Sequence, residues 1–221
     1  MKLVTYAAAV AAIAAAGSAG AGVVYSNGPG NGTVVGWTIN FSFSVADTFN
    51  AGTNNTATGM SFETWDLGSN DIPTSVDWQI WNGNPYSGGT MLYSGAGASI
   101  TASSIGSNPF GFWLFSDQIS FGGSLNLNGC AGDCWILLQN ATSSGSGGTN
   151  PVYWDENNGP SVAWENTIGN LHGFNNPGSD SETFTIFGTT PEPATWALLM
   201  CGFAGLGAAL RMKRRAPVVS A

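Results

Sequence analysis

The stretch Val35–Val45, VGWTINFSFSV, alternates apolar residues with small or polar ones at almost every step. Successive side chains of a β-strand point to opposite faces of a sheet, so a period of two predicts a strand with one buried face. Similar alternation occurs at Met60–Trp65, Val76–Trp81 and Phe184–Phe187. These patterns predict that the body of the chain is built from antiparallel strands.

Two further runs, Phe110–Phe115 and Cys134–Leu138, are continuously apolar, which predicts strands that are covered on both faces. Segments rich in Gly, Asn and Pro separate the strands, and about nine or ten strands are expected. The sequence therefore predicts an all-β fold over residues 22–188, an antiparallel β-sandwich with jelly-roll-like connections. An immunoglobulin-like sandwich is the alternative.

The first 21 residues contain the three parts of a secretory signal peptide. Lys2 precedes an apolar run, Leu3–Ala16, and Ala19-Gly20-Ala21 supplies the small residues before a cleavage site. We therefore expect signal peptidase to cleave after Ala21. A retained membrane anchor is the alternative, although the run is shorter than the ~20 residues of a spanning helix.

The C-terminal segment, 189–215, begins with the motif Pro191-Glu192-Pro193. Residues 194–210 carry no charge, and at 1.5 Å per residue they span about 26 Å, which fits a thin membrane. A basic cluster follows and would stay in the cytoplasm, so the body would face outward. The segment thus predicts one transmembrane helix over 194–210, followed by the basic residues Arg211, Lys213, Arg214 and Arg215.

Together with Trp196 and Ala197, this motif, helix and basic cluster resemble the PEP-CTERM sorting signal of the PEPxxWA type. The resemblance covers about 30 of 221 residues. It implies that a membrane exosortase removes the tail, and that the protein passes from the inner membrane to the cell surface or extracellular matrix, beside exopolysaccharide. The same tail family is also labelled after ice-binding proteins, but the chain has no repeated T-x-T array. A plain single-pass anchor is the alternative.

Charge is distributed unevenly along the chain. The sequence has 13 acidic and five basic residues, and all five basic residues lie at the two ends. A body without Lys or Arg has nothing to neutralise phosphate, so nucleic acid is excluded as a partner. The negative charge is expected to keep an exported protein soluble and to repel acidic polymers.

Cys130 and Cys134 lie close together at what the sequence predicts to be a hairpin tip. A disulfide is expected in an exported protein, and a metal or redox pair is the alternative. Two predicted acidic loops are weak calcium candidates, the first with Asp66 and Asp71 and the second with Asp155 and Glu156. Neither loop supplies the six to eight oxygens that calcium takes, so no cofactor is expected and solvated loops are the alternative.

Strand alternation also predicts a candidate glycan-binding site. In two strands it directs apolar residues inward and leaves outward a tryptophan beside polar side chains, an arrangement that suits stacking and hydrogen bonding to a sugar ring. The candidate residues are Trp65 with Glu63, and Trp81 with Asp77 and Gln79. The alternative is that a loop, a second layer or a partner chain covers both tryptophans.

No nucleophile signature accompanies the single histidine, so the expected function is non-catalytic: a structural or exopolysaccharide-binding module. One alternative is a secreted glycan hydrolase that uses two carboxylates from among Glu63, Asp77, Glu156 and Glu165. Another is a surface protein without a specific ligand.

Overall fold

A computed structural model describes residues 21–30, 32, 35–52, 56–130, 132–145, 148–167, 170–173, 181–189 and 203. Apart from Phe203, these residues belong to one compact unit, Gly20–Thr190. The predicted signal peptide up to residue 20, the sorting motif Pro191–Pro193 and the basic cluster lie outside the described residues, as does the predicted membrane helix except for Phe203. Within the described residues, no helix has both the length and the apolar character needed to cross a membrane.

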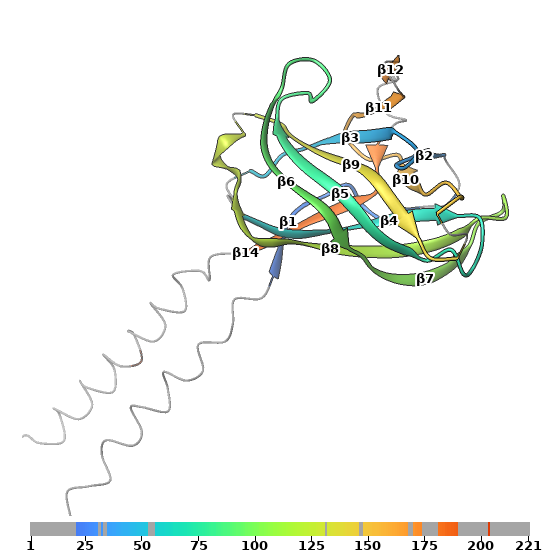
Figure 1. The fold of residues 1–221 in the computed structure, drawn as a ribbon. Helices are drawn as coiled ribbons and strands as arrows, with labels where there is room; N and C mark the ends of the chain where they lie inside the picture. Colours follow the sequence, from blue (N-terminus) through green and yellow to red (C-terminus); the bar gives the residue numbers. More distant parts are fainter. Residues whose placement is uncertain are drawn as a thin grey trace, which may run out of the picture. The chain divides into compact units, whose positions relative to one another are not determined.

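The body is almost entirely β-structure, as predicted, and forms two antiparallel sheets (Figure 1). Sheet A contains β1 (Ala21–Ser26), β2 (Gly36–Thr38), β4 (Thr56–Asp66), β7 (Thr101–Ser107), β8 (Trp113–Asn126), β10 (Tyr153–Asn157), β13 (Ser181–Glu182) and β14 (Phe184–Thr189). Sheet B contains β3 (Phe43–Phe49), β5 (Pro73–Asn82), β6 (Thr90–Ser99), β9 (Cys134–Ser143), β11 (Ala163–Thr167) and β12 (Asn170–Gly173).

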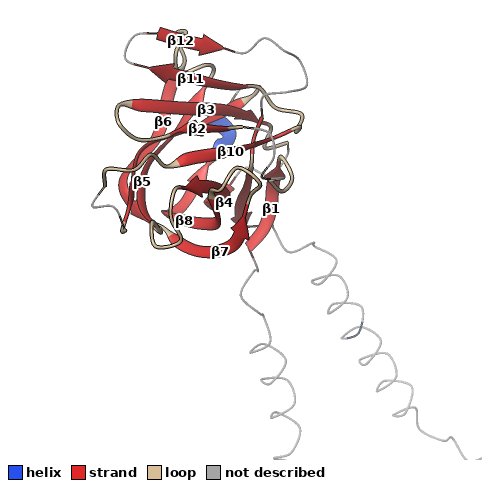
Figure 2. Cartoon of the chain, turned by 90° about the vertical axis from the view of Figure 1, so that its right-hand side faces the viewer, coloured by secondary structure: helices blue, strands red, loops and turns tan. Residues whose placement is uncertain are grey.

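The pairing of strands places segments that are distant in sequence side by side. In sheet A, β4 lies between β8 on one side and β14 and β10 on the other, and β1 pairs with β14. Sheet B has the order β12-β11-β3-β9-β5-β6. Figure 2 shows β11, β12 and β3 at one side of the molecule and β7, β8 and β4 at the other.

The main core lies between the two sheets. Sheet A contributes Phe62, Trp154 and Phe184, whose rings meet edge to face at centroid distances of 5.9 to 6.2 Å. The indole N–H of Trp154 donates a 2.8 Å hydrogen bond to Thr183 O, so its polar atom is satisfied inside the core. Sheet B contributes Trp78 and Ile136 to the same cluster. The predicted inward direction of Phe62 and Trp78 is therefore confirmed.

The prediction of one continuous strand over Val35–Val45 is wrong. The segment forms β2 in sheet A and β3 in sheet B, separated by a turn. Phe41 (φ 54°) and Ser42 (φ 72°) are left-handed, and Phe43 N donates to Asn40 O at 3.0 Å. A side-chain period of two cannot reveal this change of sheet, because the alternation of residue types continues across the turn.

The run Phe110–Phe115 was also expected to form a strand covered on both faces, and this is wrong. Phe110 is 60% exposed in a turn, and β8 begins only at Trp113. The Asn108 side chain stabilises the turn by accepting hydrogen bonds from Phe110 N (3.1 Å) and Phe112 N (3.0 Å). By contrast, Cys134–Leu138 forms the start of β9 and is buried throughout, as predicted.

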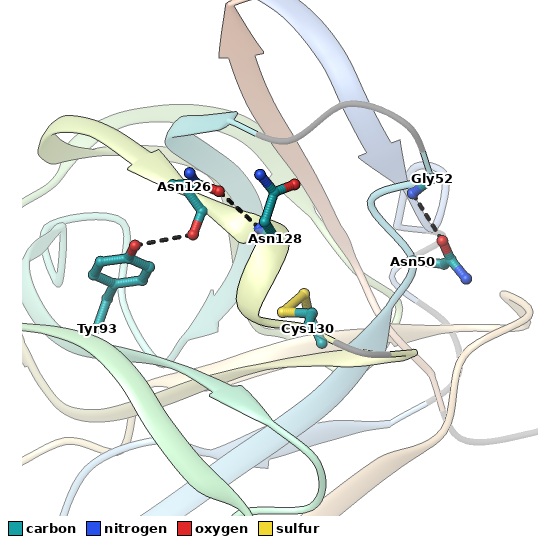
Figure 3. The surroundings of a disulfide bond; sticks show 7 residues. Asn50, Gly52, Tyr93, Asn126, Asn128 and Cys130 are labelled. Atoms are coloured by element: carbon teal, nitrogen blue, oxygen red, sulfur yellow. Dashed lines mark hydrogen bonds between the residues drawn. A yellow bond between two sulfur atoms is a disulfide. The ribbon is translucent and has the colours of Figure 1, made fainter.

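The predicted disulfide between Cys130 and Cys134 is present, with a Cα–Cα distance of 5.3 Å (Figure 3). It does not lie at a hairpin tip, because β8 belongs to sheet A and β9 to sheet B. A 3₁₀ turn, Leu127–Gly129, precedes Cys130 and is capped by the Asn126 side chain, which accepts from Asn128 N at 2.8 Å. The disulfide therefore closes a connection between the two sheets.

Candidate functional site

The outer face of sheet B carries a cluster of aromatic side chains. Trp81 of β5 and Trp135 of β9 are directly paired across neighbouring strands. Trp135 packs against Ala46 and Leu137, and partly buried Trp81 and Trp164 pack against the same cluster. Trp164 pairs with Ala46, and Ala46 pairs with Leu137, so one row of side chains crosses β11, β3 and β9. We call the set Trp81, Tyr86, Trp135 and Trp164 the aromatic face.

Tyr86 reaches this face from the loop between β5 and β6. Its hydroxyl donates to Ser44 O at 3.0 Å and lies 3.0 Å from Ser44 Oγ, which ties the loop to β3. Burial raises the pKa of Tyr86, so its hydroxyl stays protonated over the ordinary pH range. The loop is therefore held across the aromatic face by a neutral hydrogen bond.

Polar side chains lie beside the tryptophans on the same face. Gln79 Oε1 accepts a 2.9 Å hydrogen bond from Trp81 Nε1, which fixes the indole orientation. Further along β5, Asp77 accepts from Asn140 Nδ2 at 2.8 Å and from Gly97 N at 2.6 Å. Asn140 is left-handed (φ 52°) and lies at an irregularity in the pairing of β5 with β9. The arrangement thus combines aromatic surface with ordered hydrogen-bonding groups.

The predicted glycan-binding residues divide between the two sheets. Asp77, Gln79 and Trp81 lie together on β5 of sheet B, whereas Glu63 and Trp65 lie on β4 of sheet A. Trp65 is only 5% exposed, because the turn before β8 covers it. Phe110 and Phe112 lie 6.1 and 5.6 Å from its ring centroid. The structure therefore brings three of the five predicted residues together and removes Trp65 from the surface.

Sequence reasoning missed three members of the aromatic face. Trp135 was correctly assigned to a strand covered on both faces but was not proposed for the site, and Trp164 was recognised only as part of a V-x-W-polar pattern. Tyr86 lies in a loop, where strand alternation gives no direction. Alternation in β9 places Trp135 and Leu137 opposite Ile136 and Leu138, and this was the available signal for Trp135.

Buried carboxylates form a second unusual feature of the body. Glu182 of β13 pairs directly with Glu156 of β10, and both are almost fully buried. Burial raises the pKa of Glu182 well above its ordinary value, and the nearby Glu156 and Asp47 raise it further. Asp47 Oδ2 accepts from Ser161 Oγ, Glu182 N and Asn27 Nδ2 at 2.7 to 3.1 Å. These bonds only partly offset burial, which raises the Asp47 pKa to about 7.

The calcium candidates are not in solvated loops. Asp66 is the last residue of β4 and is fully buried, and burial, with Asp117 nearby, raises its pKa to about 8. Asp71 is also buried and accepts from Asn150 Nδ2 at 2.7 Å. Asp155 and Glu156 are neighbours within β10, so their side chains leave opposite faces of the strand. The side chains of the second predicted pair therefore do not point to one site.

Asp155 instead faces Glu63 of the neighbouring strand β4. Burial raises the pKa of Asp155 to about 7, the Glu63 carboxylate raises it as well, and the Trp65 indole and the Gly32 amide lower it. Within the described part of the chain, no group of three or more His, Cys, Asp or Glu side chains is arranged to hold one metal ion. Any cation held here would need neutral oxygen ligands in addition to the carboxylates.

Comparison with models of protein families, with curated proteins and with solved structures found no match to this chain.

Proposed function

We propose that this chain is a non-catalytic, exported surface protein whose body binds exopolysaccharide through the outer face of sheet B. The observation that carries the proposal is the grouping of partly buried Trp81 and Trp164 around Trp135, which is 8% exposed, on one face and from three different strands. Indole rings offer sugars a flat apolar surface, and neighbouring amides and carboxylates can bind the hydroxyls at the ring edge. Gln79 and Asp77 occupy such positions beside Trp81.

The negative charge of the body favours a neutral polysaccharide over an acidic one as the ligand. The body has no Lys or Arg, so an acidic polysaccharide would meet repulsion without a counter-charge. A neutral polysaccharide meets no such penalty, because stacking and hydrogen bonding to hydroxyls need no cation. We therefore propose that the aromatic face binds a neutral glycan.

The placement of the acidic residues supports a binding module over a hydrolase. Glu63 lies on sheet A, Asp77 on the outer face of sheet B, and Glu156 is buried. A glycoside hydrolase needs two carboxyl groups that face each other across a cleft, about 5 to 10 Å apart. Glu165, the fourth candidate, lies on β11 of sheet B, so Glu63 is on a different sheet from both Asp77 and Glu165. The proposal therefore assigns these residues no catalytic role.

We also propose that the body is jelly-roll-like. Support comes from the strand order β1-β14-β4-β8 within sheet A and β3-β9-β5-β6 within sheet B. The chain crosses repeatedly from one sheet to the other, as between β3 and β4, β4 and β5, and β8 and β9, and such crossings are typical of jelly rolls. This arrangement leaves the outer face of β9 and β5 in the middle of sheet B, where the aromatic face lies.

Export and sorting are proposed from the sequence of the two ends. Pro191-Glu192-Pro193, Trp196, Ala197 and the basic cluster resemble the PEP-CTERM signal, which implies processing by an exosortase. The test is the intact mass and cellular location of the protein in its host, with and without alanines at 191–193. A processed form outside the cell that the replacement abolishes supports sorting. An unprocessed protein in the inner membrane in both cases contradicts it.

Binding is tested by affinity electrophoresis in gels that contain the neutral polysaccharide fraction of the host matrix. We expect wild-type protein to be retarded and Trp81→Ala to lose most of the retardation. Trp113→Ala is the matched control, since Trp113 lies on β8 of sheet A and is 36% exposed. Equal retardation of wild type and Trp81→Ala, or no retardation of the wild type, would overturn the proposed site.

A further inference from the structure

A pair of carboxylates meets on the outer face of sheet A, away from the aromatic face. Tyr153 and Trp154 of β10 pair with Trp65 and Thr64 of β4, so Asp155 lies at the level of Glu63. A Cβ added at Gly30 would overlap both Asp155 Oδ2 and Glu63 Oε2. The two oxygens therefore lie at close range, in a space that exists because residue 30 has no side chain.

Among the described residues, the burial of Asp155 is only partly compensated, by the Trp65 indole and the Gly32 amide. Asp155 is 0% exposed, and neither of its carboxylate oxygens accepts a hydrogen bond within normal geometry. The Trp65 indole N–H faces the carboxylate but is also without a hydrogen bond of normal geometry. A buried carboxylate without normal hydrogen bonds costs several kcal/mol, and a second carboxylate opposite increases that cost. Such a pair needs a proton or a cation between its oxygens.

A pocket of about 300 Å³ reaches Glu63 from the surface, whereas Asp155 is fully buried and is not part of the pocket wall. The wall includes Glu63, Gly28, Pro29, and hydroxyl-bearing residues from β4, from β8 and from the link between β13 and β14. The hydroxyls belong to Ser61, Ser116 and Thr183. Oxygen atoms thus line the pocket beside Glu63, and no Lys or Arg exists in the body to neutralise the carboxylates.

We propose that Glu63 and Asp155 bind a divalent cation, calcium, in the space beside Gly30 where their oxygens approach each other. Calcium accepts six to eight oxygen ligands in irregular geometry, so two carboxylates can be completed by pocket oxygens and water. Magnesium requires near-ideal octahedral geometry and is bound more weakly by such a set. With only two charged ligands, the affinity falls in the range of extracellular calcium modules, with Kd of about 10⁻⁴–10⁻³ M.

The test is thermal unfolding and calorimetric titration of the full chain, first stripped with EDTA, then with calcium or magnesium chloride. At about 10 mM calcium we expect Tm to rise by about 5 °C, and magnesium to give a smaller shift. Glu63→Gln should abolish the calcium response. Asp133→Asn, which removes an exposed carboxylate from the connection between β8 and β9, should leave it unchanged.

The variant Asp155→Asn distinguishes calcium binding by the carboxylate pair from the sharing of a proton between the two carboxylates. Under the proposal, this variant is more stable than wild type in EDTA, because the charge repulsion is removed, and it no longer responds to calcium. If the pair only shares a proton, wild type shows no saturable calcium response, and the proposal fails. Calcium binding to Glu63→Gln with unchanged affinity would also overturn it. Glu63 is only half-buried, so Glu63→Gln is expected to fold. Its calcium response therefore tests the proposal even if Asp155→Asn does not fold. The calcium responses of these variants are measured without polysaccharide, so they test the calcium site independently of the proposed polysaccharide site.

Discussion

The outer faces of the two sheets each carry an outward-pointing tryptophan from a central strand, and they differ in what covers it. On sheet A, Phe110 and Phe112 lie against Trp65 and leave it 5% exposed. On sheet B, Trp81 pairs with Trp135 and stays only partly buried. The difference shows that strand alternation sets the direction of a side chain, while a loop from elsewhere in the chain decides whether it can meet a ligand.

The largest predicted difference between the two tryptophans is the loss of stability when each is replaced by alanine. Trp65→Ala should lower the free energy of unfolding by about 3 to 5 kcal/mol, because it leaves a cavity beneath Phe110 and Phe112. Trp81→Ala removes a half-buried side chain and should cost about 1 to 2 kcal/mol. Urea unfolding of the two variants measures both values. Equal losses would contradict the assignment of Trp65 as a structural residue.

The two sheets also differ in the surroundings of their carboxylates, and this difference makes stability depend on pH. Among the described residues, Asp155 on sheet A is buried and accepts no hydrogen bond of normal geometry, whereas Asp77 on sheet B accepts from Asn140 and Gly97. The folded-state pKa of Asp155 is raised to about 7, above its value of about 4 in an unfolded chain. Between about pH 4 and pH 7, Asp155 is therefore protonated in the folded state and ionised in the unfolded chain. Its contribution to stability is fully present below about pH 4 and is lost as pH rises through about 7.

In EDTA, we therefore expect the free energy of unfolding of the wild type to fall between about pH 4 and pH 8. Asp47, Asp66 and Asp117 act in the same direction, since burial raises each of their pKa values to between about 7 and about 8. Asp155→Asn should remove up to about 4 kcal/mol of this fall. Urea unfolding at several pH values measures it, and an unchanged slope in Asp155→Asn would contradict the assignment.

Local pattern was enough to predict the β-rich fold, the inward residues of β4 and β5, and the disulfide. Each of these follows from residues that are near each other in sequence, such as Met60 and Phe62 or Cys130 and Cys134. The change of sheet at Phe41 was not predictable in this way. It depends on Ile39 bonding to Val152 and Ala141, which are more than a hundred residues away.

For the candidate site too, only the features that depend on residues near each other in sequence could be predicted. Asp77, Gln79 and Trp81 share one strand, so alternation grouped them correctly. Trp164 joins them only because β11 pairs with β3 and β3 with β9. The facing of Glu63 and Asp155 likewise depends on the pairing of β10 with β4 and on Gly30. Pairings between distant strands are what a single sequence leaves undetermined.

The smallest predicted effect concerns the loop that crosses the aromatic face. Tyr86→Phe removes the hydrogen bonds to Ser44 and should cost about 1 kcal/mol of unfolding free energy. Tyr93→Phe is the matched control, since the Tyr93 hydroxyl donates to Asn126 O at 2.9 Å near the disulfide (Figure 3). It should cost a similar amount.

The two variants should differ in polysaccharide retention. Only Tyr86 belongs to the aromatic face, so only Tyr86→Phe should loosen the loop over Trp81 and weaken retardation in the affinity gel. Urea unfolding and affinity electrophoresis of the same preparations separate stability from binding. If Tyr93→Phe weakened retention as much as Tyr86→Phe, binding would follow overall stability and the aromatic face would lose its assigned role. If neither did, the loop would not contribute to the site, and binding would rest on the tryptophans of β5, β9 and β11 alone.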